Sequence, residues 1–248
     1  MSKNTEITTT NNAGYLALKD FNLTDVMAEE MSGLSASFER IKIPSGGGTV
    51  FEIPGDDPDE PKTVKEFSAV ILYQHPLNAY YKEEYQGGSN PPDCGSYDGV
   101  TGSTGQECAT CPYNQFGSGG GQAKACKNKR LLYILPEGEL LPQLFALPTG
   151  SLKPFTDYLK RNLSKGRRLS NVVTKITLKK ATNAGGIGYS QCVFSCERTL
   201  DPAEQAAIAP VIEQAKTYAS GLTVAQMQQY DDLPMADPET GEVIEALT

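Results

Sequence analysis

Four cysteines in one short stretch are the residues of this chain best suited to chemistry. Cys108 and Cys111 form a C-x2-C pair, and Cys94 and Cys126 flank that pair at a distance that a loop can close. Four thiolates at this spacing favour one tetrahedral zinc ion; an iron-sulfur centre, two disulfides or four unrelated thiols are the alternatives. Because four cysteine ligands leave zinc no open position, we expect a structural Zn2+ and no catalytic metal.

The segment between these cysteines contains mainly turn residues. Glycine, serine, threonine, asparagine, aspartate and proline dominate residues 94–126, so the segment has little apolar surface to bury. A metal would therefore have to organise it.

The start of the chain lacks the pattern of a signal peptide, and no apolar run approaches the roughly 18 residues of a membrane span. We therefore expect a cytoplasmic protein, in which disulfides are rare. Cys192 and Cys196, on one face of a strand pattern, are expected to be buried structural thiols.

Charge is distributed unevenly along the 248 residues. The net charge is −8, but residues 122–180 carry 13 basic and 3 acidic residues, whereas both flanking segments are acidic. A basic segment between acidic ones is typical of a surface that binds a polyanion. The alternative is a solvated surface neutralised by its acidic flanks.

Aromatic residues are interleaved with this basic segment. Single-stranded nucleic acid binds cationic grooves that carry rings on which bases stack. The candidate stacking residues are Tyr73, Tyr80, Tyr81 and Tyr133, and Tyr113 and Phe116 lie inside the cysteine segment. Ordinary core packing is the alternative for each ring. The candidate phosphate contacts are Lys124, Lys127, Lys129, Arg130, Arg161, Lys165, Arg167, Arg168, Lys175 and Lys179.

The sequence offers no catalytic constellation. Its one histidine, His75, has no nearby nucleophile or metal partner in the sequence, and phosphate-loop and nucleophile-elbow motifs do not occur. We therefore expect a protein that is not an enzyme and has no small-molecule substrate.

The acidic C-terminal segment predicts a role in binding. Its acidic-apolar stretch, which could compete for the basic surface or dock on partner proteins, is Asp231, Asp232, Leu233, Pro234 and Met235. An inert acidic tail is the alternative.

Short strand patterns predominate in the elements that must position these residues. We expect a hairpin from residues 38–43 and 49–53, strands over 67–73, 127–135, 140–147, 172–179 and 189–198, and helices over 18–31, 152–163 and 202–219. In the strand at 172–179, alternate lysines predict a cationic face. This order fits a mainly β fold with flanking helices. The specific expectation is a partly closed, OB-like β-barrel with an inserted four-cysteine zinc loop.

The combined pattern resembles the single-stranded DNA-binding proteins of bacteriophages, in particular the zinc-containing, T4-type helix-destabilising family. The resemblance is architectural and covers residues 35–248. It implies sequence-independent coating of single-stranded DNA during phage replication and recombination, without membrane contact and with partner recruitment through the tail. The T4-type site has one histidine and three cysteines, whereas this chain has four cysteines, and it lacks that family's basic N-terminal arm.

The predicted organisation is a polar N-terminal segment with a weak helix (1–34), an OB-like core (35–220) with its zinc loop at 94–126, and an acidic tail (221–248). The rival prediction is a zinc-stabilised protein-interaction module, such as an inhibitor of a host enzyme, that does not bind nucleic acid.

Overall fold

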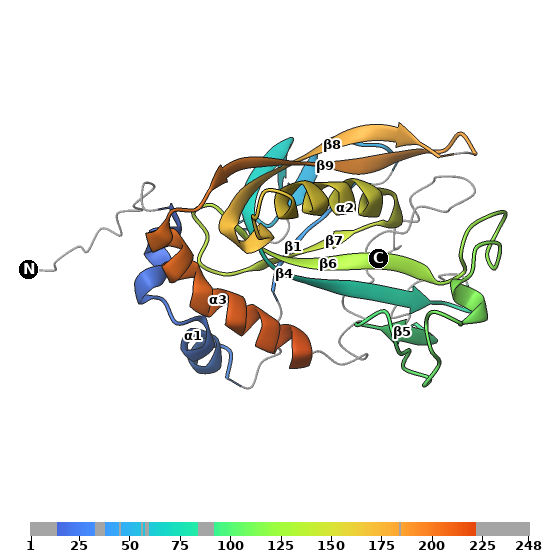
Figure 1. The fold of residues 1–248 in the computed structure, drawn as a ribbon, viewed down its shortest axis with the longest axis horizontal. Coiled ribbons are helices and arrows are strands. Elements are labelled where there is room, and N and C mark those ends of the chain that lie inside the picture. Colours follow the sequence, from blue (N-terminus) through green and yellow to red (C-terminus); the bar gives the residue numbers. More distant parts are fainter. Residues whose placement is uncertain are drawn as a thin grey trace, which may run out of the picture.

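The computed structural model shows a mainly β protein with a curled, half-barrel sheet and helices on both sides of it (Figure 1). The structure describes residues 14–32, 38–44, 46–55, 57, 60–83, 92–183 and 185–221. The seven-stranded sheet has the order β1-β7-β6-β4-β8-β9, and β5 pairs with β4 off this path. Its strands are β1 (Arg40–Ile41), β4 (Glu66–Tyr80), β5 (Cys94–Ser96), β6 (Lys127–Pro136), β7 (Gln143–Leu147), β8 (Val172–Thr182) and β9 (Gly188–Thr199).

The two central strands, β4 and β6, bury side chains on both faces of the sheet. Along β6, Leu131 and Tyr133 belong to one apolar cluster, whereas Leu132 and Ile134 belong to a second cluster. Alternate side chains of a strand point to opposite faces, so the continuous apolar run in β6 requires cover on both sides.

Helices supply this cover (Figure 1). The 3-10 helix η1 (Gly14–Asp20), α1 (Leu23–Glu30) and α3 (Pro202–Gly221) enclose the first cluster. The helix α2 (Thr149–Leu163) and the strand β2 (Phe51–Ile53) enclose the second cluster, into which Phe155 and Tyr158 project from α2. Two short 3-10 helices, η2 (Pro112–Asn114) and η3 (Leu169–Asn171), complete the set.

A bend in β4 changes its strand partners. Its first half pairs with β8 from Glu66 to Val70, its last three residues pair with β5, and the register shifts between Ile71 and Tyr73. A bulge of this kind increases local twist and bends a strand. The sheet therefore curls. Beyond Val70 the pairing with β8 ends, and β5, the start of the cysteine segment, pairs with the last residues of β4.

Most predicted elements are confirmed, with shifted ends. The strands at 67–73 and 127–135 become β4 and β6, and the patterns at 172–179 and 189–198 become β8 and β9. The predicted strand at 140–147 begins only at Gln143. The helix α2 begins at Thr149, ahead of the predicted cap Ser151; that side chain is buried and accepts a hydrogen bond from the Cys192 backbone N–H. The N-terminal pattern at 18–31 is divided between η1 and α1, with Asn22 as the N-cap.

The predicted hairpin at residues 38–53 was mostly wrong. Its first strand, β1, pairs in parallel with β7, and its second strand, β2, pairs with β3 (Lys62–Val64). Only the Lys42–Glu52 bridge joins the two predicted arms among the described residues. Alternation identifies a strand but does not choose its partner.

An ion-pair cluster attaches α3 to the sheet. Arg198 on β9 donates hydrogen bonds to Glu204 at 2.8 Å and to Glu137 at 2.9 Å. Glu204 in turn accepts from the Asp201 N–H at the start of α3.

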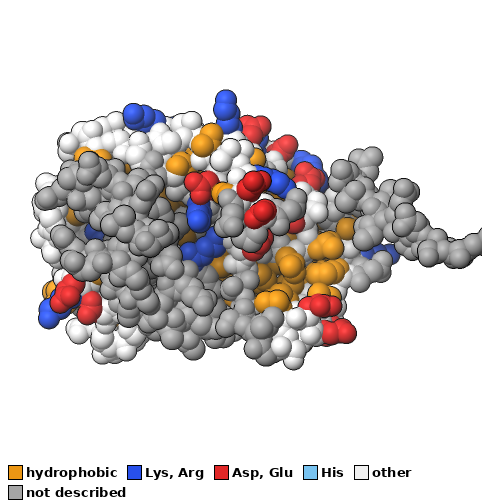
Figure 2. All heavy atoms as spheres, turned by 180° about the vertical axis from the view of Figure 1, so that it is seen from behind, with side chains coloured by type: hydrophobic (Ala, Val, Ile, Leu, Met, Phe, Trp, Pro, Cys, Tyr) orange, Lys and Arg blue, Asp and Glu red, His pale blue; other side chains and the backbone are white. Residues whose placement is uncertain are grey.

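From behind, hydrophobic side chains gather on the side where α1 and α3 lie, with acidic side chains at the margin (Figure 2). In the described part of the chain, no helix is long and apolar enough to cross a membrane.

Candidate metal centre and nucleic-acid interface

The cysteine segment is an extension between the end of β4 and the start of β6. β5 returns antiparallel to β4, with Cys94 opposite Tyr80, and the chain then passes through η2 before Cys126 precedes β6. We call residues 94–126 the thiol loop. Its two ends are therefore fixed by neighbouring strands of the sheet, and its interior must fold between them.

Polar hydrogen bonds organise the interior of the thiol loop. The Asp98 carboxylate accepts from the backbone N–H groups of Val100 and Thr101 and from the Ser96 hydroxyl, and these bonds lower its pKa. Asn114 donates to the Cys108 carbonyl at 2.7 Å. These contacts satisfy backbone and side-chain groups, but they bury little apolar surface.

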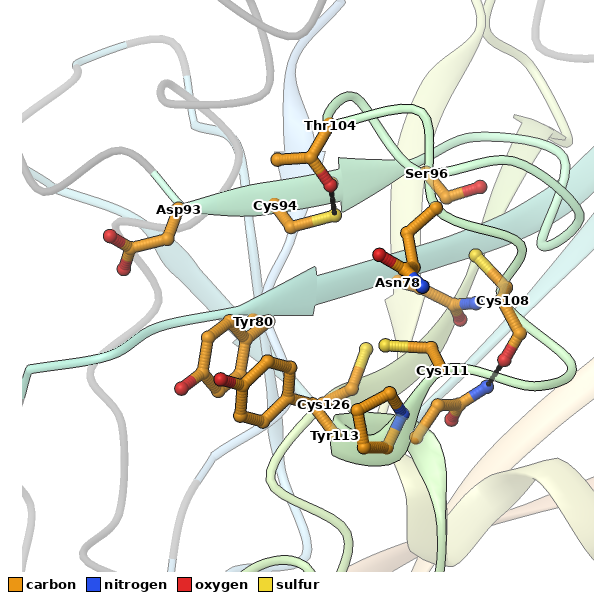
Figure 3. Close-up of a pocket in the computed structure, with 14 residues that line it drawn as sticks. Asn78, Tyr80, Asp93, Cys94, Ser96, Thr104, Cys108, Cys111, Tyr113 and Cys126 are labelled. Carbon is orange, nitrogen blue, oxygen red and sulfur yellow. Dashed lines mark hydrogen bonds between the residues drawn. The ribbon is translucent and has the colours of Figure 1, made fainter.

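All four predicted ligands line one pocket of about 220 Å3 beneath this loop. Figure 3 shows the thiols of Cys94, Cys108, Cys111 and Cys126 around the same hollow, between β5 and the turn that carries η2. The six cysteines of the chain are all free thiols. The spacing in sequence therefore corresponds to a common location in space.

The thiols of the pocket influence each other electrostatically. The pKa of Cys126 is raised to about 11. Burial is the main cause, and the nearby thiols of Cys108, Cys111 and Cys94 contribute to the same increase. Burial also opposes ionisation of Cys94, but hydrogen bonds from Thr104 and Ser103 outweigh it, and the net pKa is lowered. A divalent cation would relieve the repulsion among ionised thiolates and favour their deprotonation.

The backbone is unusually close to one thiol. A Cβ atom added at Gly102 would lie 2.6 Å from the Cys94 sulfur, so only glycine fits there without displacing it. The Thr104 hydroxyl donates to the same sulfur at 3.5 Å. Within the described residues, however, no group of three or more His, Cys, Asp or Glu side chains is arranged as a metal-ligand cluster. The structure brings the four thiols to one pocket without closing them into a tetrahedron.

Aromatic rings border the pocket. The rings of Tyr80 and Tyr113 stack with centroids 4.1 Å apart and planes at 17°, and their hydroxyls point away from the thiols (Figure 3). Tyr113 is 47% exposed and Phe116 is 82% exposed. The Lys124 ammonium lies 5.0 Å from the centre of the Phe116 ring.

The predicted stacking residues separate into accessible and buried rings. Tyr80 belongs to the stacked pair, and Tyr81 is half-buried just beyond β4. Tyr73 is half-buried against the first apolar cluster. Tyr133 is 0% exposed, because its place in β6 directs it into that cluster, and its ring offers no face to a base. Tyr133 is therefore a core residue and not part of an exposed binding surface.

Part of the predicted basic set lies beside the thiol loop. Lys124 is in the loop, and Lys127, Lys129 and Arg130 begin β6 directly after it. The pKa of Lys129 is lowered to about 8. Burial is the main cause, and the positive charges of Arg40 and Lys127 contribute to the same decrease.

The β8 lysines differ in their surroundings. Lys175 pairs with Glu66 at 2.6 Å, which raises the pKa of Lys175. Lys179 is exposed and lies opposite Gln191, whose side chain donates to the Gly150 carbonyl at the start of α2. Because Thr149 donates to the Asn128 carbonyl, Lys179 and the start of β6 lie toward the same end of the sheet. The predicted alternation of β8 is confirmed, although one of its lysines already has a carboxylate partner.

The remaining predicted cations lie at the other end of α2. Arg161 is in its last turn, and Lys165, Arg167 and Arg168 follow it. Thr149 lies beside the start of β6. A helix rises 1.5 Å per residue, so Arg161 is roughly 18 Å from Thr149 along the axis of α2. The basic segment 122–180 therefore forms two separate groups in space.

Two further predictions concern residues outside this surface. His75 is buried; its Nδ1 lies 2.7 Å from the Pro76 carbonyl and 3.1 Å from the Tyr97 carbonyl, so Nδ1 carries the proton, and burial lowers the pKa. Cys192 is buried and Cys196 half-buried in the second apolar cluster, where Arg167 donates to the Cys196 sulfur. These three side chains have structural surroundings. The tail residues Asp231, Asp232, Leu233, Pro234 and Met235 lie outside the described residues.

Two exposed rings, Tyr113 and Phe116, are missing from the stacking residues predicted from the sequence. Both lie in the cysteine segment, whereas the predicted tyrosines all lie outside it. The available signal was an aromatic residue in a segment with no core to enter, since such a ring must remain accessible. Comparison with known proteins does not add to this assignment. No protein-family model matches the chain, and neither a curated protein nor a solved structure matches it.

Proposed function

We propose that this chain is a zinc-stabilised protein that coats single-stranded DNA without sequence specificity, in phage replication or recombination. The observation that carries the proposal is the co-location of exposed aromatic rings and basic side chains on and beside the thiol loop. Rings bind unpaired bases, and lysines and arginines bind the phosphates that follow them. The protein would perform no chemistry on the strand.

One zinc ion would be held by Cys94, Cys108, Cys111 and Cys126. The pocket common to these thiols, the close approach of Gly102 to Cys94 and the mutual influence of the thiols on ionisation support this assignment. With four thiolate ligands the ion would supply structural stability to the loop and no Lewis-acid chemistry. Metal analysis of the purified protein distinguishes zinc from iron.

An OB-like architecture with the zinc loop as an insertion is the fold we propose for this function. The curled sheet is compatible with it, and the loop departs from the sheet between β4 and β6. The phosphate path would run over Lys124, Lys127 and Lys129 toward Lys179. Arg130 follows Lys129 in β6 and therefore belongs to the opposite face of the sheet, where it donates to the Gln74 side chain. The group at the end of α2 would contact a strand only if the path continues along the length of that helix.

The acidic C-terminal segment would act as a competitor and as a docking segment. It carries six acidic residues and no basic residue from Tyr230 onward. Such a segment can occupy a basic surface until a polyanion displaces it, and it can then engage replication or recombination proteins. Its removal should therefore strengthen DNA binding.

Fluorescence anisotropy with labelled oligo-dT and a matched duplex tests the proposal. We expect tight, salt-sensitive, strand-selective binding that strengthens when residues 229–248 are removed. The paired variant Lys124→Ala/Lys127→Ala should weaken binding and flatten the slope of log affinity against log salt by about 0.7 per lost contact.

The matched control is Arg161→Ala/Arg168→Ala, which removes the same charge from the other group. A larger loss from this control would place the contact surface at the end of α2. Absence of binding to either nucleic acid at low salt would refute the coating function and favour the protein-interaction module.

A further inference from the structure

We infer that Phe116 and Lys124 form a subsite for one unpaired nucleobase on the outer surface of the thiol loop. The inference rests on the proposed function and deepens it, because it assigns strand selectivity to a particular ring. The subsite would lie in the metal-stabilised extension, outside the sheet itself.

Exposure is the first observation behind this inference. Phe116 is 82% exposed, more than any other large hydrophobic side chain among the described residues. Exposure of a whole phenyl ring to water is unfavourable, because apolar surface is more stable when it is removed from water. In a segment held together by polar contacts, folding does not account for this ring, whereas a ligand with a flat apolar face would cover it.

The position of Lys124 is the second observation. Its ammonium lies over the ring at 5.0 Å from the centroid, and it also donates to the Asn114 side-chain oxygen at 3.2 Å. The cation therefore occupies one face of Phe116, and the opposite face is left for stacking. A base on that face would bring its own phosphate within range of a fixed positive charge.

The backbone around the ring is well anchored. The Ser118 hydroxyl shares its one proton between the Gln115 carbonyl at 2.6 Å and the Tyr113 carbonyl at 2.9 Å, and it accepts from the Ala125 N–H. The Cys126 N–H donates to the Tyr113 carbonyl at 2.8 Å. Residues 113–126 thus form a closed turn with the ring at its surface. A ring on a fixed turn loses little conformational freedom when a base stacks on it.

A second exposed ring of the thiol loop, Tyr113, lies three residues before Phe116 in the chain. It stacks on Tyr80 and remains half-exposed. Tyr113 is thus supported from the sheet, whereas Phe116 is supported only by the loop. We therefore place the subsite at Phe116 and expect Tyr113 to contribute less, because its Tyr80 partner already covers one face.

A single tryptophan provides a direct test. The chain contains no tryptophan, so Phe116→Trp introduces a unique fluorophore at the subsite. We expect its emission to be quenched by oligo-dT and unchanged by an abasic oligonucleotide of equal length and charge. The matched control is Val100→Trp, placed at another exposed apolar position of the thiol loop, which should not respond to either strand.

Affinities complete the test. Phe116→Ala should lower oligo-dT affinity on the order of tenfold and leave abasic affinity unchanged, because stacking requires the base whereas phosphate contacts do not. Phe116→Tyr should retain most of the affinity. If wild-type protein binds oligo-dT but Phe116→Ala binds it equally well, the subsite is refuted and the coating function stands. If wild-type protein binds no DNA, the proposed function fails as well.

Discussion

The sheet and the thiol loop achieve order by different physical means. The sheet buries apolar side chains on both faces, with Leu132, Tyr133 and Phe145 among its fully buried residues. The thiol loop has exposed rings, turn residues and four thiols around a pocket, and its fixed contacts are mainly hydrogen bonds. Exposed rings are thus held on a segment that has no apolar core, and in our proposal metal ligation replaces burial there.

Removing one of the four proposed zinc ligands should have the largest effect, confined to the loop. Cys108→Ser would leave three thiolates, and structural zinc contributes roughly 10–16 kcal/mol of apparent binding free energy in small zinc domains. We expect loss of bound zinc by metal analysis and loss of amide protection over residues 98–126, with protection of β6 and β8 retained. Cys192→Ser is the matched control for zinc content, since that thiol lies in the sheet. Full zinc retention in Cys108→Ser would contradict the four-thiol site.

Two phenylalanines, one from each region, sharpen the contrast. Phe145 is fully buried and packs edge-on against Phe51 and Phe67, whereas Phe116 is almost wholly exposed. Phe145→Ala should lower the free energy of unfolding by about 3–5 kcal/mol, because it leaves a cavity in the second cluster. Phe116→Ala should change it by about 0.5 kcal/mol or less. Urea unfolding followed by circular dichroism measures both, and equal destabilisation would overturn the assignment of the two regions.

The Arg198 cluster, which joins β9 to α3, predicts a pH dependence of global stability. Hydrogen bonds from Arg198 lower the pKa of Glu204 below its usual 4.5. The carboxylate therefore stabilises the folded state above that value, and the contribution is lost as the pH falls through the lower folded pKa.

Arg198→Gln should cost about 2 kcal/mol at pH 7, and less near pH 3. Urea unfolding at both pH values tests this, with Lys216→Gln as a control from an exposed ion pair on α3. A constant cost at both pH values would show that the Glu204 ionisation is not responsible.

The smallest expected effect concerns the polar turn of the thiol loop. Asp98→Ala removes the acceptor for the Val100 and Thr101 N–H groups, so the loop should release zinc to a chelator a few times faster. Global stability should be unchanged, because Asp98 is exposed. Asp157→Ala on α2 is the control and should leave the release rate at the wild-type value. A slower release from Asp98→Ala would argue against a positioning role for this turn.

The sequence determined the features that depend on local pattern. Continuous or alternating apolar residues identified β4, β6, β8 and β9, and the spacing of the cysteines indicated the one pocket that all four thiols line. These features follow from the period of a strand and the reach of a short loop, which neighbouring residues set.

Only the tertiary structure decided which elements are partners and which side chains are accessible. It paired β1 with β7 in place of β2, buried Tyr133 beneath α3 and divided the basic segment between the two ends of α2. Pairing and burial depend on contacts between residues far apart in the chain, and a single sequence carries no local signal for them. For the same reason Phe116 gained its significance only when the structure left its ring in solvent with Lys124 on one face.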